Sequence, residues 1–241
     1  MKINGRNKWK MYLAMKKNKK LSKYLVDTKL WSKINFYTML SSYKSIVVKP
    51  NKGLKAKNIY FICEKEEGYE TQIYERKYSF LNREEVYKFM QGKIGQVTYI
   101  IQKHIKMAKI DGRPFDIRVI IQRKSLSSPW TATAYKIRVA KEGRKVTNAS
   151  KGGTILTFKA AMNRCNIPKH IKKNLLGHIK ELSTLASKTL GPYYSNKRLF
   201  GIDIGIKEDG SLHIFEINRS PLLKGFSRLQ QKRISRYKRR K

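Results

Sequence analysis

The sequence predicts an α+β protein in which most strands pair antiparallel, and three features support this prediction. Short runs of β-branched and aromatic residues begin at Ile46 and alternate with turn residues, which is typical of a meander. An amphipathic helix is expected after Pro168, and an Asp-Gly pair separates two apolar runs farther along the chain. The 241 residues suffice for one compact unit or for two small lobes.

The first 45 residues are rich in lysine, and their loose helical period predicts one or two helices. Strands are then expected at residues 46–49, 59–62, 69–74, 97–102, 115–123 and 131–139. The order of these runs, with helical stretches between and after them, is what favours the α+β class over an all-β fold.

Two later helices carry recognisable end signals. Asn82, followed closely by two glutamates, predicts the N-cap of a helix that ends near Gly92. The amphipathic helix that starts at Pro168 is expected to stop at Gly191, before another proline. The basic tail from Lys224 lacks apolar periodicity, so we expect a frayed helix or a disordered segment there.

Charge is the exceptional part of the composition. Lys and Arg number 55 against 16 Asp and Glu, which gives a net charge of +39. Such a field attracts nucleotides, nucleic acid, anionic polymers or anionic lipid surfaces, so it indicates a class of partner and not a reaction. The hydrophobic fraction of 40% argues against disorder of the whole chain.

Targeting and redox signals are weak. No apolar run is long enough to span a bilayer, and no apolar signal-peptide segment follows the basic N-terminus, so we expect a soluble cytoplasmic protein. Cys63 and Cys165 have no partner at metal-ligand spacing and are expected to be buried, reduced thiols.

The strongest local signal is a hairpin. An Asp-Gly pair at residues 209–210 joins the apolar runs 199–206 and 212–218. A two-residue turn at this pair would place Asp203 directly opposite Glu216. The resulting core face would carry Ile202, Ile204, Ile206, Phe215 and Ile217. The resulting polar face would carry Gly201, Asp203, Gly205, Glu216 and Asn218.

Two carboxylates directly opposite each other repel unless a cation lies between them. Asp203, Glu216 and Asn218 offer only hard oxygen ligands, which suit Mg²⁺ or Mn²⁺ and argue against zinc or copper. Three such side chains fit a metal–nucleotide site better than a closed structural cage, because magnesium usually keeps phosphate oxygens among its ligands. The alternative interpretation is an exposed hairpin whose acids pair with surplus lysines.

Several motifs occur in a fixed order from about residue 46 to residue 226. They are Val48-Lys49-Pro50 with Gly53, Tyr99-Ile100-Ile101-Gln102, Arg113-Pro114-Phe115-Asp116-Ile117-Arg118-Val119, Arg138, Asn148 to Gly153, Gly201-Ile202-Asp203-Ile204-Gly205 and Phe215-Glu216-Ile217-Asn218. With these motifs the sequence resembles the YheC/YheD branch of the ATP-grasp superfamily, whose members are associated with bacterial endospore coats.

The resemblance implies an ATP-grasp fold, in which two α+β lobes with mainly antiparallel sheets grip ATP. The smaller lobe would span residues 46–102 and the larger lobe, with the metal hairpin, residues 103–226. A basic helical segment, 1–45, would precede them and a basic tail, 227–241, would follow. The usual chemistry of the family is activation of a carboxylate as an acyl-phosphate, which an amine or similar nucleophile then captures.

The resemblance also assigns roles to residues of the smaller lobe. Lys49 ends a strand beside a turn with Gly53, from which an ammonium can reach α- and β-phosphate oxygens. The backbone of Gln102 and Lys103 would meet the adenine edge. The bland alternatives are a solvated lysine and a plain strand end.

In the larger lobe, Asp116 and Arg118 share one strand face, so the acid would orient the guanidinium towards the γ-phosphate or an acyl-phosphate. Arg138 is the other candidate for stabilising charge on the transferred phosphoryl group. A structural Asp–Arg pair is the alternative. The loop residues Asn148, Gly152 and Gly153 would let the backbone approach phosphate closely, or else form a plain flexible turn.

Two departures from the family pattern bear on activity. Similar proteins usually carry a further domain before the strand that holds Lys49, and their loop after this lysine has more glycines. We therefore expect magnesium–ATP binding and leave ligase turnover on an unknown carboxylate substrate open. The alternative function is a non-catalytic, polybasic coat or scaffold protein that binds a polyanion or coat partner through residues 16–20 and 236–241, at the endospore coat. Specific nucleic-acid recognition is not expected, because no helix-turn-helix, zinc or RNA-recognition pattern occurs.

Overall fold

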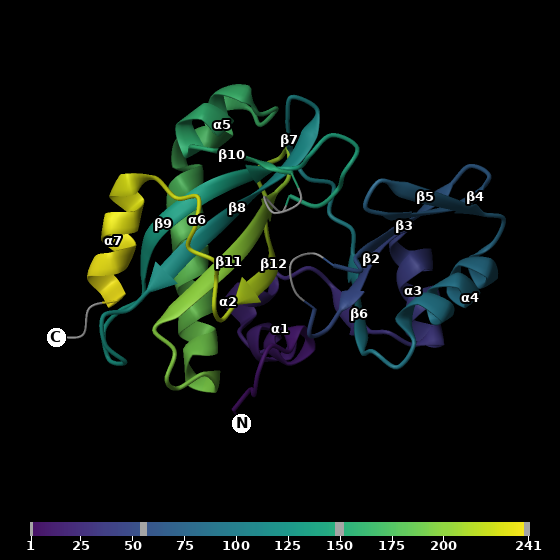
Figure 1. The fold of residues 1–241 in the computed structure, drawn as a ribbon, viewed down its shortest axis with the longest axis horizontal. Coiled ribbons are helices and arrows are strands. Elements are labelled where there is room, and N and C mark those ends of the chain that lie inside the picture. Colours follow the sequence, from purple (N-terminus) through teal and green to yellow (C-terminus); the bar gives the residue numbers. More distant parts are fainter. Residues whose placement is uncertain (1, 54–56, 148–151, 239–241) are drawn as a thin grey trace.

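A computed structural model describes residues 2–53, 57–147 and 152–238, which form two lobes, each built on one sheet (Figure 1). The smaller sheet has the strand order β1-β6-β2-β3-β4-β5. The larger sheet has the order β10-β9-β8-β11-β12, and the short β7 pairs with β8. Neighbouring strands in both sheets pair antiparallel, which confirms the α+β class with mainly antiparallel strands.

In the smaller lobe, two helices cover one face of the sheet. The elements are β1 (Thr28–Leu30), α3 (Lys33–Tyr43), β2 (Ser45–Pro50), β3 (Tyr60–Lys65), β4 (Gly68–Ile73), β5 (Arg76–Phe80), α4 (Arg83–Ile94) and β6 (Tyr99–Lys103). Phe36 of α3, Met90 of α4 and Ile101 of β6 are fully buried between helices and sheet. The opposite face of this sheet carries Lys49 and Gln102 and is turned towards the larger lobe.

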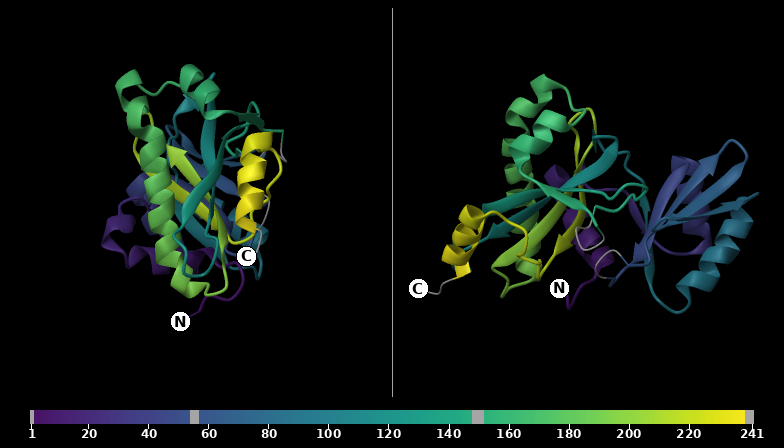
Figure 2. Two further views of the ribbon diagram at one scale, coloured as in Figure 1. Left: turned by 90° about the vertical axis from the view of Figure 1, so that its left-hand side faces the viewer. Right: turned by 45° about the horizontal axis from the view of Figure 1, so that its top comes forward.

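In the larger lobe, helices lie on both faces of the sheet (Figure 2). The elements are β7 (Lys109–Ile110), β8 (Arg113–Gln122), β9 (Thr131–Val139), β10 (Thr154–Leu156), α5 (Phe158–Arg164), α6 (Lys169–Leu190), a 3₁₀ turn (Gly191–Tyr193), β11 (Leu199–Ile206), β12 (Leu212–Asn218) and α7 (Arg228–Lys238). The apolar stripe of α6, with Ile179, buries one face together with Val119 and Ile202. The other face carries the polar residues described below.

The N-terminal segment is more elaborate than the one or two helices expected from the sequence. It contains α1 (Lys8–Lys16), α2 (Lys19–Ser22) and β1, ahead of α3. Helix α1 packs on α6 and β12, so it belongs to the core of the larger lobe. Between the helices and α3, residues 24–30 touch both sheets: Leu25 bridges Ile214 at the edge of the larger sheet, and β1 pairs with β6 at the edge of the smaller one.

The helix ends follow their local chemistry. The side chain of Asn82 caps α4 by accepting the amide of Glu85 at 3.0 Å, as predicted, although the helix continues past Gly92 to Ile94. Helix α6 ends before Gly191, also as predicted. The basic tail forms α7, because one buried side chain, Ile234, fixes it against Ile120 and Ala134 of the larger sheet.

Cys165 is buried and Cys63 is partly buried, and neither forms a disulfide. Within residues 2–53, 57–147 and 152–238, no helix has both the length and the apolar character needed to cross a bilayer.

Candidate functional site

A row of four charged side chains crosses the larger sheet on the face opposite α6. Lys136 on β9 pairs in register with Arg118 on β8, Arg118 pairs with Asp203 on β11, and Asp203 pairs with Glu216 on β12. Residues directly opposite each other in an antiparallel pair project from the same face with Cβ atoms about 5 Å apart. The expected opposition of Asp203 and Glu216 is therefore confirmed, and two cations continue the row.

The hairpin reaches this register by a different route from the one expected. Lys207 donates its amide to Ser211 O at 3.0 Å, so the loop has three residues, 208–210, with Gly210 at φ +79°. A three-residue loop alone would shift the register by one position. A β-bulge between Asp203 and Ile204 inserts one extra residue on β12 and restores the pairing of Asp203 with Glu216.

Phe215 does not lie in the core as predicted, because the bulge changes the face of the sheet to which it belongs. The hairpin prediction placed this side chain in the core, but Ile214 takes the core position instead. A Cβ on Gly205 would lie 2.0 Å from the Phe215 ring, so the ring covers Gly205 on the polar face of the sheet. The extra residue of the bulge is the physical reason, because one inserted residue reverses the alternation of side chains along a strand.

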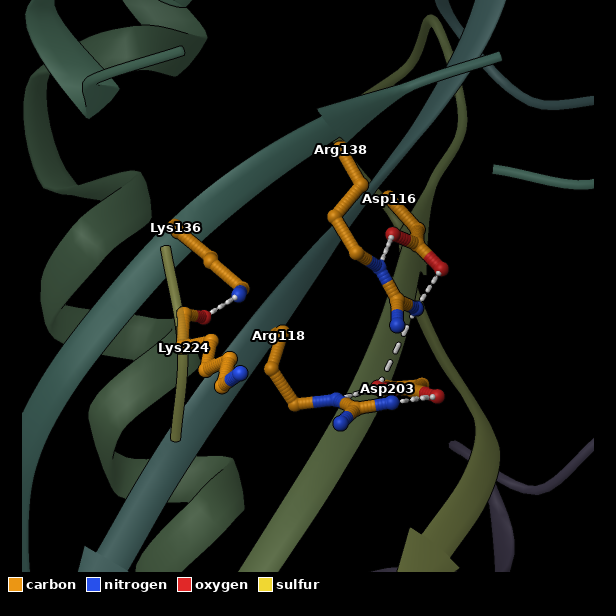
Figure 3. A network of polar contacts seen from close by, with 6 residues as sticks. All are labelled: Asp116, Arg118, Lys136, Arg138, Asp203 and Lys224. Atoms are coloured by element: carbon orange, nitrogen blue, oxygen red, sulfur yellow. Dashed lines mark hydrogen bonds and ion pairs between the residues drawn. The ribbon is translucent and has the colours of Figure 1, made fainter. Parts of the chain in front are cut away.

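Two arginines and two aspartates form an interlocked cluster on this face (Figure 3). Arg118 holds Asp203 through two nitrogens, with Nη2 2.8 Å from Oδ2. Arg138 holds Asp116 in the same two-point manner, with Nε 2.7 Å from Oδ1. Arg138 also reaches Asp203, with Nη2 3.2 Å from Oδ1, so the two pairs are joined.

The partners differ from the predicted pairing of Asp116 with Arg118. Asp116 lies directly opposite Arg138 on β9, and Arg118 lies directly opposite Asp203 on β11. Cross-strand partners are closer than residues two apart on one strand, so the ion pairs form between strands. Burial disfavours the charge on Asp203, but Arg118 and Arg138 outweigh it and lower the pKa of this carboxyl. Asp116 and Asp203 likewise raise the pKa of Arg138 against the effect of burial.

Two lysines approach the other end of the row from outside the larger sheet. Lys49 of the smaller lobe donates to the backbone oxygen of Phe215 at 3.2 Å, and burial lowers its pKa to about 8 although Glu216 opposes the shift. Lys8 of α1 lies with its Nζ 3.6 Å from Glu216 Oε1, and burial also lowers its pKa. The sequence did not single out Lys8, because nothing distinguishes it locally from the many other cations of the chain.

Lys136 is the third lysine near the row, and the sequence did not single it out either. Its Nζ donates to Lys224 O at 2.5 Å and lies 4.4 Å from the centre of the Phe226 ring. Burial, and then the charges of Arg118 and Arg138, lower its pKa to about 8. The signal that could have revealed it is its position two residues before Arg138, which puts both on one face of β9.

The remaining candidates lie in the smaller lobe and in the loop after β9. The side chain of Gln102 donates to Thr28 at 2.8 Å, and the amide of Lys103 donates to Asp27 O at 3.0 Å, so β1 covers this edge of β6. Gly53 donates its amide to Pro50 O at 3.3 Å. Gly152 has a φ of +84°, which suits a glycine, and Gly153 follows it. Asn148 lies outside the described residues.

The donor set suits a hard divalent cation. Asp203, Glu216 and Asn218 lie together on the polar face at one end of the hairpin. Asn218 Nδ2 is one of the buried polar atoms without a hydrogen-bond partner among the described residues, so this NH₂ group is free to donate to an acceptor such as a phosphate oxygen, whereas a metal ion would be held by Oδ1. In the described ranges, no group of three or more His, Cys, Asp or Glu side chains is placed to hold a metal ion.

Two solved synthetases share this architecture. D-alanyl-alanine synthetase A from Vibrio cholerae superposes with a TM-score of 0.55 at 14% identity, covering 98% of this chain and 62% of that protein. N5-carboxyaminoimidazole ribonucleotide synthetase from Thermotoga maritima gives 0.54 at 13% identity, over 98% and 50%. At such low identity these similarities show the fold alone.

The sequence comparisons are more specific. The chain is 22% identical over 225 residues to the endospore coat-associated protein YheD of Bacillus subtilis, covering 89% of this chain and 48% of YheD. It is 24% identical over 239 residues to the endospore coat-associated protein YheC of the same organism, covering 92% of this chain and 62% of YheC. It thus spans between about half and three fifths of these relatives. Residues 3–240 match the family described as YheC/D like ATP-grasp, so the chain belongs to the YheC/D-like ATP-grasp family.

Proposed function

We propose that this protein binds magnesium–ATP between its two sheets and acts as a ligase-like enzyme that forms an acyl-phosphate from a carboxylate and joins it to an amine or similar nucleophile. The observation that carries the proposal is the charged row of the larger sheet, with Lys49 of the smaller lobe beside it. Cations at one end and hard oxygen ligands at the other suit a bound metal–triphosphate.

The roles of the residues follow from their positions. Lys49 would hold phosphate oxygens from the smaller lobe. Asp203, Glu216 and Asn218 would hold the magnesium ion, which supplies neutralisation of phosphate charge when bound. Arg118 and Arg138 would stabilise the transferred phosphoryl group, and their two-point ion pairs hold both guanidinium groups in place before a ligand arrives.

Both carboxylates have a cation partner of the chain itself, since Asp203 pairs with arginines and Glu216 with Lys8. This observation favours a second candidate function, that of a non-catalytic coat or scaffold protein. Such a protein would retain the fold and bind a polyanion through its basic surface. The names of the two curated relatives support a place at the endospore coat for either function.

Calorimetry of magnesium–ATP binding separates the two functions. Glu216→Gln keeps the size of the side chain and removes the charge, and Glu181→Gln on the exposed side of α6 is the matched control. We expect saturable binding by the wild type and by the control, and affinity at least about tenfold lower in Glu216→Gln, since a charge-assisted contact contributes about 1.5–3 kcal/mol. Binding that responds to salt but not to Glu216→Gln would support the scaffold function instead.

Turnover needs a separate assay. ADP release should be measured with panels of carboxylic acids, with hydroxylamine present to capture an acyl-phosphate. Release that depends on the added acid and is lost in Arg118→Met supports the ligase activity. Magnesium–ATP binding with no acid-dependent release across the panels would limit the function to nucleotide binding.

A further inference from the structure

The N-terminal helix α1 joins the two lobes at the candidate site. Its body packs in the core of the larger lobe through Met11 and Met15. Its first turn holds the smaller lobe: the amide of Lys8 donates to Asn51 O at 3.2 Å, and the amide of Trp9 donates to Asn51 Oδ1 at 2.9 Å. Asn51 directly follows β2 and is buried, with 5% of its surface exposed, so this junction is part of the packed interior.

The side chain of Lys8 makes a second contact with the same segment. Its Nζ donates to Pro50 O and Gly53 O, both at 3.0 Å, and lies 3.4 Å from Asn51 O. The fourth oxygen near this ammonium is Glu216 Oε1, at 3.6 Å, on β12 of the larger lobe. A single cation therefore lies among oxygens of both lobes, with 10% of its side chain exposed.

This contact lies at the point where the proposed ligand must be held from two sides. Lys49, one residue before Pro50, donates to Phe215 O, one residue before Glu216. The two lysines thus fix neighbouring positions of β2 to neighbouring positions of β12. A phosphate group bound between Lys49 and Glu216 depends on the spacing of these two strands.

We propose that Lys8 is a positioning residue of the nucleotide site, whose ammonium ties the 50–53 segment to Glu216 and sets the spacing of the two lobes before a nucleotide binds. The role in nucleotide binding rests on the proposed function, whereas the tie between the lobes does not.

Hydrogen exchange of the nucleotide-free protein tests the tie directly. The variants are Lys8→Met and Glu216→Gln, each alone and combined, with Lys10→Met on the exposed face of α1 as the matched control. The reporters are the amides of Trp9, Asn51 and Gly53, and peptides of α6 report on global stability. We expect exchange about tenfold faster at the three amides in Lys8→Met, unchanged exchange in α6, and no further increase in the combined variant.

Unchanged exchange at these amides in Lys8→Met would overturn the proposal, as would faster exchange spread equally over the reporters and α6. A second readout is the Kd for magnesium–ATP, which should rise about tenfold in Lys8→Met and stay at the wild-type value in Lys10→Met. A loosened segment with an unchanged Kd would contradict the positioning role. If the wild type binds no nucleotide, the proposed function fails, and the exchange comparison still decides whether Lys8 ties the lobes.

Discussion

The candidate site has an arginine half and a lysine half, which are held in different ways. In the arginine half, Arg118 and Arg138 pair with Asp203 and Asp116, and all four side chains come from adjacent strands of one sheet. In the lysine half, made of Lys8, Lys49 and Glu216, the two cations come from α1 and the smaller lobe and donate mostly to backbone oxygens.

The contacts of the arginine half lie within one sheet, whereas the contacts of the lysine half depend on the relative position of the two lobes. The arginine half is set by strand register and persists if the smaller lobe moves. The lysine half exists only at one spacing of β2 and β12. Substitutions in the arginine half should therefore change stability first, and substitutions in the lysine half should change ligand affinity first.

The largest effect is expected from Asp116→Ala. Asp116 and Arg138 are 4% and 8% exposed, so this change leaves a buried guanidinium with only its longer contact to Asp203. Breaking such a pair costs about 3–5 kcal/mol in the free energy of unfolding, measured by urea denaturation. Glu84→Ala, which removes an exposed carboxylate together with its contacts to Lys33 and the Tyr37 hydroxyl, should change stability less. Equal effects of the two variants would contradict the view that the arginine half holds the sheet together.

Lys49→Met should have the opposite signature. Because the ammonium is buried, removing it relieves a desolvation penalty, so the free energy of unfolding should not fall. The Kd for magnesium–ATP should rise about 10- to 100-fold, as expected for the loss of a charge-assisted phosphate contact. The two quantities are measured by urea denaturation and by calorimetry. A loss of stability with unchanged affinity would mean that Lys49, like the arginine half, stabilises the fold and does not bind the nucleotide.

Gly205→Ala tests how the two halves are connected. A methyl group at this position would overlap the Phe215 ring, and Phe215 supplies the backbone oxygen that Lys49 contacts. Overpacking of this kind costs about 1–3 kcal/mol. The control is Gly177→Ala, where the added methyl meets open space on a helix and should stabilise by about 0.5–1 kcal/mol. If Gly205→Ala is neutral, the ring does not hold this part of the bulge.

A change of pH should have opposite effects on stability and on nucleotide binding. The folded-state pKa of Lys49 and of Lys136 is lowered from 10.5 to about 8, so between about pH 8 and 10.5 the unfolded chain binds more protons than the folded one. The contribution of these lysines to stability therefore rises with pH in this window. Nucleotide affinity needs charged Lys49 and should fall about tenfold between pH 7 and pH 9.

Urea denaturation and calorimetry across this range measure the two trends. Lys49→Met should abolish the trend in affinity, and it should only reduce the trend in stability, because Lys136 still titrates. An unchanged pH dependence of the Kd in this variant would assign the titration to another group.

The sequence predicts side-chain positions well where they depend on a single strand or a single hairpin. Alternation along β11 put Asp203 on a polar face, and the apolar residues at 202, 204 and 206 left no other register compatible with a buried core. The turn type and the bulge were not predictable, because the three-residue loop and the inserted Phe215 cancel each other in the final pairing.

Contacts between residues far apart in the sequence could not be predicted from local sequence patterns. Alternation along one strand predicts a pairing of Asp116 with Arg118, whereas the sheet places Arg138 directly opposite Asp116. Lys8 was missed for the same reason: its oxygen partners come from positions 50–53 and 216, far away in the sequence. The adenine and loop roles of Gln102, Lys103, Gly53, Gly152 and Gly153 stay predictions.

The stretch from residue 24 to residue 30, which completes the edges of both sheets, has a consequence for folding. Neither sheet can reach its final edge pairing until the same short piece of chain has settled between them. Heating should therefore melt the two halves of the molecule in a single calorimetric transition, with no plateau at which one half survives alone.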